Sequence, residues 1–392
     1  MEKQWVKIPE VLFFQEGPGV RNTQYTTEGV KLLNVANLVD GKVDLSTSDR
    51  YISKEDAYGK YKHFLCDAGD FIVASSGIKV EYIDKKMGFI DEAMLPLCMN
   101  TSTIRFKVLD EKQLKIRYFM YYLKSQHFKS QLSKYITGSA QLNYGPSHLS
   151  KMIVPLVSVH EQIGIISILD KVQHIIDVRQ QQLQKLDQLV KARFVEMFGA
   201  ISEVVPLSYY IGGLNAGKSL AGEEENPNKV LKTGAATYDY FDETQIKNLP
   251  IDYEPQENHR VKAGDVIISR MNTAELVGAA AYVWDVPEHI YLPDRLWRAE
   301  VKETANPIFV WQVLIQSSTK ENIRRIASGT SGSMKNISKP GLLGIRVVKA
   351  PIDLQEQFAA FVEQTDKSKA AVEKASDEAR SLFDCLMQEY FK

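Results

Sequence analysis

One continuous helix, expected over residues 158–198, constrains the fold of this chain more than any other stretch. Ser158 follows Pro155 and stands three residues before Glu161, which is the spacing of a capping box at a helix start. Apolar or long-stemmed side chains then alternate in steps of four and three residues: Ile165, Leu169, Val172, Ile176, Arg179, Leu183, Leu186, Val190, Arg193 and Met197. This spacing is typical of a coiled-coil seam. The length of the helix favours the same interpretation, because few helices of ordinary globular domains exceed about 25 residues.

A second pattern of the same kind closes the chain. Pro351 precedes Asp353 and Glu356, which predicts another cap and capping box and a helix over residues 353–392. Its expected seam positions are Phe358, Phe361, Thr365, Ser368, Val372, Ala375, Ala379, Leu382 and Leu386. The middle of this seam is small where the first seam is rich in Ile and Leu. Small against large favours close antiparallel packing of the two helices.

An internal repeat accompanies the two helices. Residues 68–75 (Ala-Gly-Asp-Phe-Ile-Val-Ala-Ser) match residues 263–270 (Ala-Gly-Asp-Val-Ile-Ile-Ser-Arg), and Glu161-Gln162 matches Glu356-Gln357 at the same offset. Shorter matches join residues 35–37 to 235–237 and residues 138–143 to 329–336. The repeat predicts a chain with approximate two-fold symmetry, laid out as domain, helix, domain, helix over residues 1–157, 158–199, 200–352 and 353–392.

Each globular segment mixes strand-like and helix-like stretches, which indicates an α/β (α+β) fold. Apolar runs predict strands at residues 32–37, 70–74, 103–108, 230–233 and 266–269. Residues 115–135 and 306–327 are each expected to form one helix, the second with Asn306 as its cap and Pro307 in its first turn. Residues 208–232 are expected to form a loop.

Composition narrows the class of protein. The 392 residues include three cysteines without a CxxC motif, which favours a reducing, cytoplasmic compartment. The first residues carry charges and no apolar stretch, so no signal peptide is expected, and the apolar run at residues 163–169 is too short to span a membrane. The seven histidines show no ligand spacing. We therefore expect no metal, no cofactor and no catalytic set in this chain.

Positive charge is concentrated in matching parts of the two halves, although the net charge is only −1. Residues 112–151 hold seven Lys or Arg and no acidic residue, and residues 318–349 hold seven with one acidic residue, Glu321. A solvated charged surface would explain one such segment better than two matched ones. The pattern favours two phosphate-contacting faces, as expected for binding to double-stranded DNA.

Polar side chains on loops and turns are the candidate DNA contacts. Arg, Asn and Gln can bond to base edges, and small polar turns leave backbone N–H groups available for an anion. The candidates are Arg21, Asn22, Gln24, Lys134, Ser139, Gln141, Asn143, Arg270, Asn272, Arg324, Arg325, Ser331, Ser333, Lys335 and Asn336. The same loop residues fit ordinary turns equally well.

One local motif points to a different class of protein. Residues 212–219 (Gly-Gly-Leu-Asn-Ala-Gly-Lys-Ser) fit the phosphate-loop pattern GxxxxGK[ST]. That chemistry requires a buried strand before the loop and a long helix after it. Residues 208–211 form a weak strand pattern, and residues 223–227 (Glu-Glu-Glu-Asn-Pro) would end a helix within two turns. The sequence therefore argues against nucleotide hydrolysis.

Taken together, these features resemble the specificity subunit of type I restriction-modification enzymes over nearly the whole chain. The resemblance is carried by the repeat of domain plus long helix and by the Pro and Glu-Gln residues that open each helix. It is also carried by the turns at residues 138–143 and 329–336 and by residues 230–235 (Val-Leu-Lys-Thr-Gly-Ala).

The resemblance implies a fold and a function. Each globular part would be a target recognition domain that reads one half of a bipartite DNA site, and the two long helices would pair antiparallel as a spacer. The subunit itself would be non-catalytic. It would direct adenine methylation by two methyltransferase (modification) subunits that use S-adenosylmethionine, and cleavage by restriction (motor-nuclease) subunits that use ATP and Mg.

Two alternatives stay open at this point. The turns at residues 138–143 and 329–336 fit a junction between recognition domain and helix, or a methyltransferase contact, as well as a DNA contact. The whole chain also fits a coiled-coil scaffold with two binding modules and no DNA preference.

Overall fold

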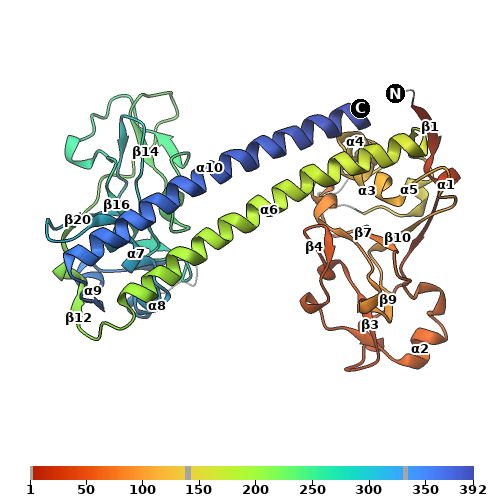
Figure 1. The fold of residues 1–392 in the computed structure, drawn as a ribbon, viewed down its shortest axis with the longest axis horizontal. Helices are drawn as coiled ribbons and strands as arrows, with labels where there is room; N and C mark the ends of the chain where they lie inside the picture. Colours follow the sequence, from red (N-terminus) through yellow and green to blue (C-terminus); the bar gives the residue numbers. More distant parts are fainter. Residues whose placement is uncertain (1–2, 137–142, 330–333) are drawn as a thin grey trace. The chain divides into compact units, whose positions relative to one another are not determined.

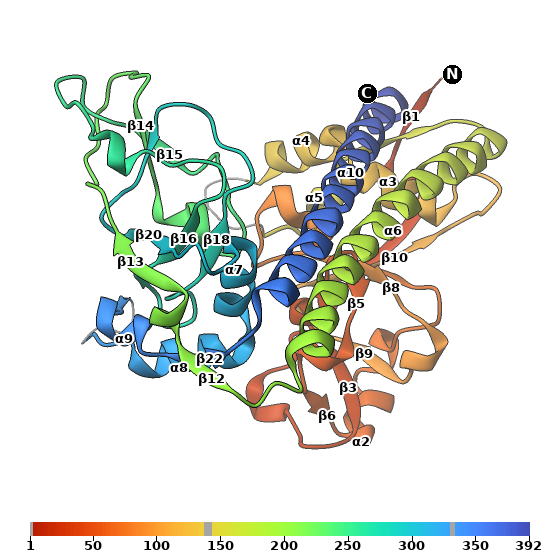
Figure 2. The same cartoon turned by 60° about the vertical axis from the view of Figure 1, so that its left-hand side comes forward.

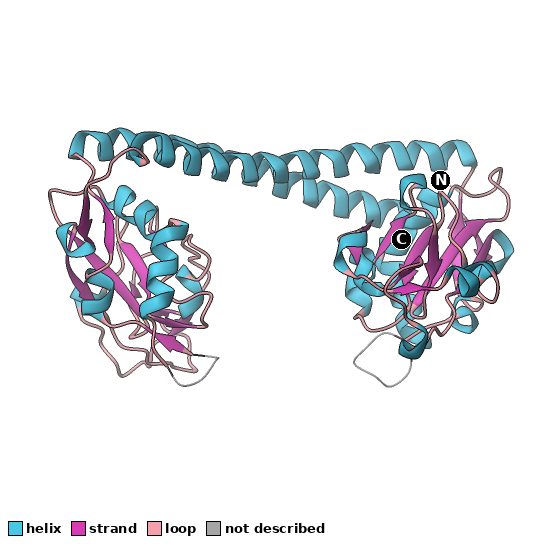
Figure 3. Ribbon diagram, turned by 90° about the horizontal axis from the view of Figure 1, so that it is seen from below, coloured by secondary structure: helices cyan, strands magenta, loops and turns pink. Residues whose placement is uncertain are grey.

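A computed structural model describes residues 3–136, 143–329 and 334–392 (Figure 1). The chain divides into two compact units. Unit 1 comprises residues 1–180 with 374–392, and unit 2 comprises residues 181–373. Both units combine short helices with sheets, so the expected mixed α/β class is confirmed. Figure 3 shows the strands of each unit flanked by short helices.

Unit 1 contains a central four-stranded sheet with smaller sheets beside it. The central order is β2 (Leu12–Glu16), β10 (Thr103–Val108), β7 (Phe71–Ala74) and β8 (Met87–Phe89). A three-stranded sheet runs β6 (Tyr51–Ile52), β3 (Val30–Leu33), β9 (Leu97–Met99). The pairs are β1 (Gln4–Lys7) with β11 (Ile153–Leu156) and β4 (Leu38–Val39) with β5 (Lys42–Val43).

Unit 2 repeats this strand order. Its central sheet runs β13 (Ile211–Asn215), β20 (Leu296–Val301), β16 (Val266–Ser269), β18 (Ala280–Tyr282). The three-stranded sheet runs β15 (Ile246–Asn248), β14 (Lys229–Leu231), β19 (Ile290–Tyr291). The pairs are β12 (Val204–Pro206) with β22 (Arg346–Val348) and β17 (Met271–Asn272) with β21 (Lys335–Asn336). In both units one pair of the small sheet is parallel, β3 with β9 and β14 with β19.

The expected loop at residues 208–232 was therefore wrong in part. Its first portion forms β13, which pairs antiparallel with β20 across a register shift between Ile211 and Gly213. Two glycines and an asparagine give this strand a weak propensity, so only the partner strand determines its conformation.

The short helices of unit 1 are α1 (Ile8–Val11), α2 (Lys54–Tyr58), α3 (Ile116–Lys124), α4 (Gln126–Tyr135) and α5 (Pro146–Leu149), and those of unit 2 are α7 (Pro307–Ile315), α8 (Ser317–Ile326) and α9 (Lys339–Leu343). The two single helices expected at residues 115–135 and 306–327 are each split in two. Ser125 ends α3 and caps α4, its Oγ accepting the Phe128 N–H at 3.3 Å. Gln316 has an extended backbone between α7 and α8. Asn306 caps α7 as expected.

Two helices are each 40 residues long, α6 (Val159–Phe198) and α10 (Ile352–Phe391). The capping box of α6 is confirmed, since the Glu161 N–H donates to Ser158 Oγ at 3.2 Å and the Ser158 N–H donates to Glu161 Oε2 at 3.0 Å. The cap expected at Asp353 was wrong. Helix α10 begins directly after Pro351, which leaves Asp353 inside the first turn, where its charge favours the helix N-terminus.

A buried glutamine fixes the start of each long helix. The Gln162 amide accepts the Lys115 N–H at 2.9 Å and donates to the carbonyls of Gln113 and Val157. In unit 2, Gln355 makes two of the corresponding bonds: it accepts the Asn306 N–H at 3.0 Å and donates to the Ala350 carbonyl at 2.8 Å. Both are the fourth residue of their helix. The expected match of Gln162 with Gln357 was therefore wrong by two residues, and Gln357 is exposed.

The expected seam residues of α6 are all buried or half-buried. In unit 1, Ile165 and Leu169 share a core with the last turns of α10, the blue end in Figure 1. In unit 2, Val190, Phe194 and Phe198 of α6 share a core with the first turns of α10.

The α10 seam holds except at Leu382, which is 51% exposed. Phe383 packs on the unit 1 core in its place, with its ring 6.2 Å from that of Tyr121. Phe383 therefore packs against the aromatic side chains of α3, and Leu382 faces solvent.

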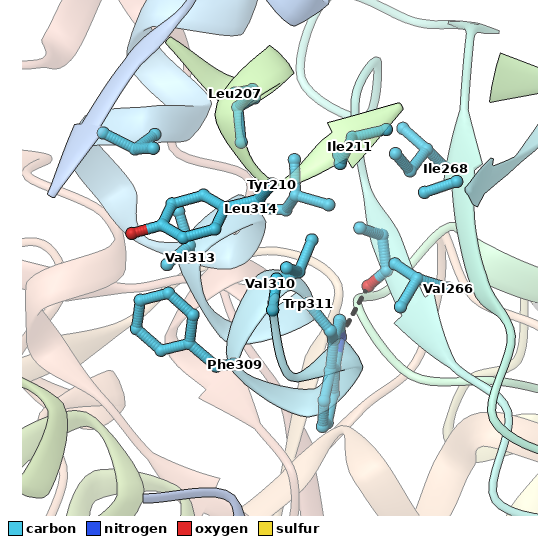
Figure 4. Close-up of a cluster of buried hydrophobic side chains, with 14 of the residues drawn as sticks. Leu207, Tyr210, Ile211, Val266, Ile268, Phe309, Val310, Trp311, Val313 and Leu314 are labelled. Carbon is cyan, nitrogen blue, oxygen red and sulfur yellow. Dashed lines mark hydrogen bonds between the residues drawn. The ribbon is translucent and has the colours of Figure 1, made fainter. Parts of the chain in front are cut away.

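Helix α7 covers β16 and β18 in unit 2 (Figure 2). Figure 4 shows the side chains of this core, including Tyr210, Ile268 and Phe309, and the indole N–H of Trp311 that donates to the Ala280 carbonyl at 3.0 Å. This packing holds the ends of β16 and β18 in fixed positions, and the polar residues described below lie beside those ends.

Candidate nucleic-acid interface

In both units, the central strand β7 or β16 ends beside a segment from much later in the chain. In unit 1, Ser76 forms an antiparallel bridge with Asn143, and the Ser75 carbonyl accepts the Tyr144 N–H at 2.9 Å. In unit 2, β17 follows β16 and pairs with β21, so Met271 lies opposite Asn336. Asn143 and Asn336 thus lie at equivalent edges of the two central sheets.

The candidates of unit 2 come together at this edge. Arg270 Nε donates to Asn336 Oδ1 at 3.5 Å, and its guanidinium lies 5.5 Å from the Trp297 ring centroid. Asn272 lies opposite Lys335 in the pairing of β17 with β21. Arg324 of α8 donates to the Glu275 carbonyl in the connection after β17, at 3.0 Å. Four polar or cationic side chains and Arg324 therefore share one surface.

The other three unit 2 candidates are not part of this cluster. Arg325 on α8 is exposed and donates to Asn322 Oδ1 at 3.1 Å. Ser331 and Ser333 lie outside the described residues.

The candidates of unit 1 are more dispersed. Arg21 and Asn22 are exposed, at a 3-10 turn spanning Asn22–Gln24. The Gln24 amide accepts the Arg21 N–H at 3.1 Å and donates to Tyr61 Oη at 3.0 Å, so it shapes its own turn. Lys134 and Asn143 are exposed, whereas Ser139 and Gln141 lie outside the described residues. Within the described part of the chain, no hydrogen bond or ion pair joins the Arg21 turn to Lys134 or Asn143.

Much of the positive charge at residues 112–151 is already paired. Arg117 contacts Asp170 of α6 at 2.7 Å, Lys115 contacts Glu111 at 3.1 Å, and Lys129 contacts Asp84 at 3.0 Å. Burial lowers the pKa of the Lys124 ammonium. Three of the seven cations are thus paired within the unit and a fourth is largely buried, so the phosphate-contacting face is smaller than the sequence suggests.

The charge of residues 318–349 is partly paired as well. Lys320 pairs with Asp239, and Lys349 contacts Glu203 at 2.7 Å. Arg346 donates to the Val204 carbonyl at 2.7 Å, next to the pairing of β12 with β22. Arg324, Arg325 and Lys335 contact neutral oxygens instead, so their charges are not neutralised by these contacts.

Sequence reasoning missed an aromatic pair next to the unit 2 cluster. Tyr238 and Tyr240 are 68% and 55% exposed, and their ring centroids lie 6.4 Å apart in a stacked arrangement. Asp239 between them has a φ of 65°, accepts the Ala280 N–H at 3.2 Å and pairs with Lys320 of α8. Asn272 donates to Thr237 Oγ1 at 3.4 Å, which attaches this loop to the cluster. The order Tyr-Asp-Tyr at residues 238–240 was the sequence signal that could have indicated this exposed aromatic pair.

A cavity in unit 1 was also missed. It measures about 520 Å³ and lies between the β4–β5 turn and the connection from β7 to β8. Its lining includes Asp40, Gly77, Lys79, Tyr82, Lys85 and Lys86. Sequence reasoning placed the positive charge of unit 1 at residues 112–151 and so overlooked these three lysines.

The phosphate-loop match lacks the geometry that its chemistry needs. Gly212 to Asn215 belong to β13, and no helix follows within the described residues 216–232. Gly217 packs so closely on the Leu292 carbonyl that a Cβ there would lie 1.9 Å from its oxygen. The motif therefore forms a strand and a tight chain crossing.

The described residues contain no group of His, Cys, Asp or Glu side chains arranged to hold a metal ion. Their helices include none with the length and apolar character that crossing a lipid bilayer demands.

Comparison with known proteins gives the class. Residues 21–188 match the family model of the type I restriction modification DNA specificity domain. The resemblance to type I specificity subunits is confirmed. The MjaVIII specificity subunit of Methanocaldococcus jannaschii is 26% identical over 190 residues, covering 47% of this chain and 43% of that protein. The EcoEI specificity subunit of Escherichia coli is 24% identical over 186 residues, covering 45% and 31%. The chain thus spans less than half the length of these curated relatives.

Solved structures extend the fold likeness beyond the matched domain. The type I S subunit from M. genitalium aligns with a TM-score of 0.58 at 16% identity, covering 100% of this chain and 96% of that one. A second solved structure, whose subject is the structural basis of complex assembly and conformational transition of the type I R-M system, aligns with a TM-score of 0.55 at 14% identity. The alignment covers 100% of this chain and 97% of that one. The type I specificity-subunit fold therefore includes unit 2, which the family model barely reaches.

Proposed function

We propose that this chain is the DNA-specificity subunit of a type I restriction-modification complex. Each globular domain reads one half of a bipartite DNA site. One observation carries the proposal: unit 1 holds most of the matched DNA specificity domain, and unit 2 repeats its strand order. Polar candidate residues gather at the edge of the central sheet in unit 2, and the candidate Asn143 lies at the equivalent edge in unit 1.

The proposal assigns the long helices the role of a spacer. Domains at residues 1–157 and 200–352 are the two readers, and the helices at residues 158–199 and 353–392 pair antiparallel between them with pseudo-two-fold symmetry. Each helix of 40 residues is about 60 Å long at about 1.5 Å per residue. A spacer of that length would separate the two half-sites by unread base pairs.

Chemistry belongs to the partners in this proposal. Two methyltransferase subunits with S-adenosylmethionine methylate adenine, and restriction subunits with ATP and Mg cleave, while this chain supplies double-stranded DNA recognition in the cytoplasm. The support is the class of the relatives, which are named specificity subunits.

The decisive experiment is a methylome. N6-methyladenine is mapped by long-read sequencing in host DNA with the gene present, deleted and restored. A split motif with a fixed unread gap should disappear on deletion and return with the intact gene, because the specificity subunit alone selects the site. An unchanged pattern would count against the proposal and favour a scaffold with two binding modules.

A further inference from the structure

We propose that the loop of residues 79–86, and not the basic segment at residues 112–151, is the element of unit 1 that contacts the DNA phosphate backbone. This inference rests on the proposed function and locates its contact surface. Within the loop, Lys79, Tyr82 and Lys85 are exposed and Lys86 is half-buried, and all four line the cavity described above.

The lysines of this loop are available to a ligand. Among the described residues, no carboxylate forms an ion pair with Lys79, Lys85 or Lys86. The loop itself also carries Glu81 and Asp84, and Lys129 pairs with Asp84, so Glu81 and the rim residue Asp40 offset two of the three charges. At residues 112–151, by contrast, Lys115, Arg117 and Lys129 already have carboxylate partners. At the loop, a polyanion would therefore meet three ammonium groups without ion pairs within one short, ordered segment.

The loop is held in a fixed shape, which reduces the entropy lost on binding. Residues Val80–Lys85 form a 3-10 helix around the fully buried Ile83. The Lys85 carbonyl accepts the Gly41 N–H at 3.1 Å, and the Lys86 carbonyl accepts the Ala74 N–H at 2.8 Å. From the back, Lys129 Nζ donates to the Glu81 carbonyl at 3.0 Å.

The position and chemistry of the loop fit a duplex backbone. It leaves β7 through Ser76 and Gly77, directly beside the bridge to the candidate residue Asn143. Ammonium groups are point charges that suit phosphate positioning and carry no base preference. Tyr82 is 51% exposed, and its ring centroid lies 5.6 Å from Lys85 Nζ, so it offers a flat face beside the cations.

The test compares two triple variants of the full chain with equal loss of charge. One is Lys79→Ala/Lys85→Ala/Lys86→Ala, and the control is Lys112→Ala/Lys115→Ala/Lys151→Ala in the basic segment. Binding to a mixed-sequence DNA duplex is titrated at several salt concentrations. The loop variant should bind about tenfold or more weakly at 0.1 M salt, with the log–log salt slope reduced by about 2 to 3, since each phosphate contact contributes about 0.9. The control should change affinity less than about twofold, by the same counting of phosphate contacts.

Two further variants separate charge from folding. Lys79→Arg/Lys85→Arg/Lys86→Arg keeps the charge and should restore binding. A photocrosslinking residue at position 82 should form adducts with the duplex, whereas one at position 112 should not.

The outcomes distinguish the two proposals. If the native chain binds DNA in a salt-dependent manner but only the control variant loses affinity, this inference is overturned and the proposed function stands. If the native chain shows no DNA binding and an acidic protein binds the loop instead, both proposals are overturned.

Discussion

The two units place an aspartate in the same turn, fully buried in unit 1 and half-buried in unit 2, with different surroundings. Asp70 is 2% exposed and accepts the Asp67 N–H at 2.9 Å, Arg105 Nη1 at 3.1 Å and Lys107 Nζ at 3.1 Å. Asp265 has an 18% exposed side chain, accepts the Lys262 N–H at 2.9 Å and has Arg298 at 3.6 Å. Burial raises the pKa of Asp265 against these contacts.

The arginines also bind the neighbouring turns in both units. Arg105 donates to the carbonyls of Leu65 and His63, and Arg298 donates to those of Arg260 and Asn258. Each ties the central sheet to the chain entering it. The junction between the central sheet and the chain entering it is therefore repeated through polar contacts in both units, because an unpaired buried polar group is costly. The exposed connections have no such constraint.

The exposed connections that follow β7 and β16 differ between the two units, whereas the buried contacts of the sheets are repeated. From β7 to β8, residues 75–86 carry three lysines and a single tyrosine, Tyr82. From β16 to β18, residues 270–279 carry Arg270, Asn272 and Glu275, with the Tyr238–Tyr240 pair alongside. On the proposed function, unit 1 would rely more on backbone contacts at this edge, and unit 2 more on base contacts.

The largest expected effect is on the two arginines. Arg105→Met should reduce the free energy of unfolding of unit 1 by about 3–5 kcal/mol, since a buried pair loses one partner. Arg298→Met should reduce that of unit 2 by about 1–3 kcal/mol, because its ion pair is longer and less buried. Urea unfolding followed by hydrogen exchange on peptides of each unit measures both. Lys107→Met is the control and should cost less than about 1 kcal/mol. Equal losses for the two arginines would contradict the comparison.

The tyrosine pair should give the next largest effect. Replacing Tyr238 and Tyr240 by Ala should weaken binding to the cognate site by about 1–3 kcal/mol, which is the scale of one lost contact to a base edge in a groove. The loss should relax sequence preference in one half of the recognition motif, which methylome mapping reports. Tyr209→Ala is the matched control, because Tyr209 is also exposed in unit 2 but lies beside Lys349. Relaxation in both halves, or in neither, would separate this loop from half-site reading.

The smallest expected effect is the pH dependence of Asp265. Its pKa in the folded unit lies above the usual 3.8, so the folded unit binds more protons than the unfolded chain just above pH 3.8. Stability contributed by this group is present at low pH and is lost as pH rises through the folded pKa. Urea midpoints of the native chain should therefore fall relative to those of Asp265→Asn as pH increases above 3.8. Parallel pH profiles would show that the pKa of Asp265 is not raised.

Local patterns predicted the elements whose signals lie within a few residues. The capping box at Ser158, the Asn306 cap and the strand at residues 266–269 were confirmed, because capping and apolar runs depend on immediate neighbours. The splitting of the helices at Ser125 and Gln316 was not predicted. Apolar periodicity continues across both positions, and packing on the sheet decides where the backbone turns.

The sequence by itself determined that this chain repeats one plan and carries two long helices, since heptads and matched segments are properties of residue order. Only the tertiary structure decided that Gln355, and not Gln357, is the counterpart of Gln162, because a buried amide is defined by the groups that it satisfies. It also decided which cations are already paired. Ion pairs such as Arg117 with Asp170 join residues that the sequence separates, so charge counts along a segment overstate the positive surface that the folded unit presents.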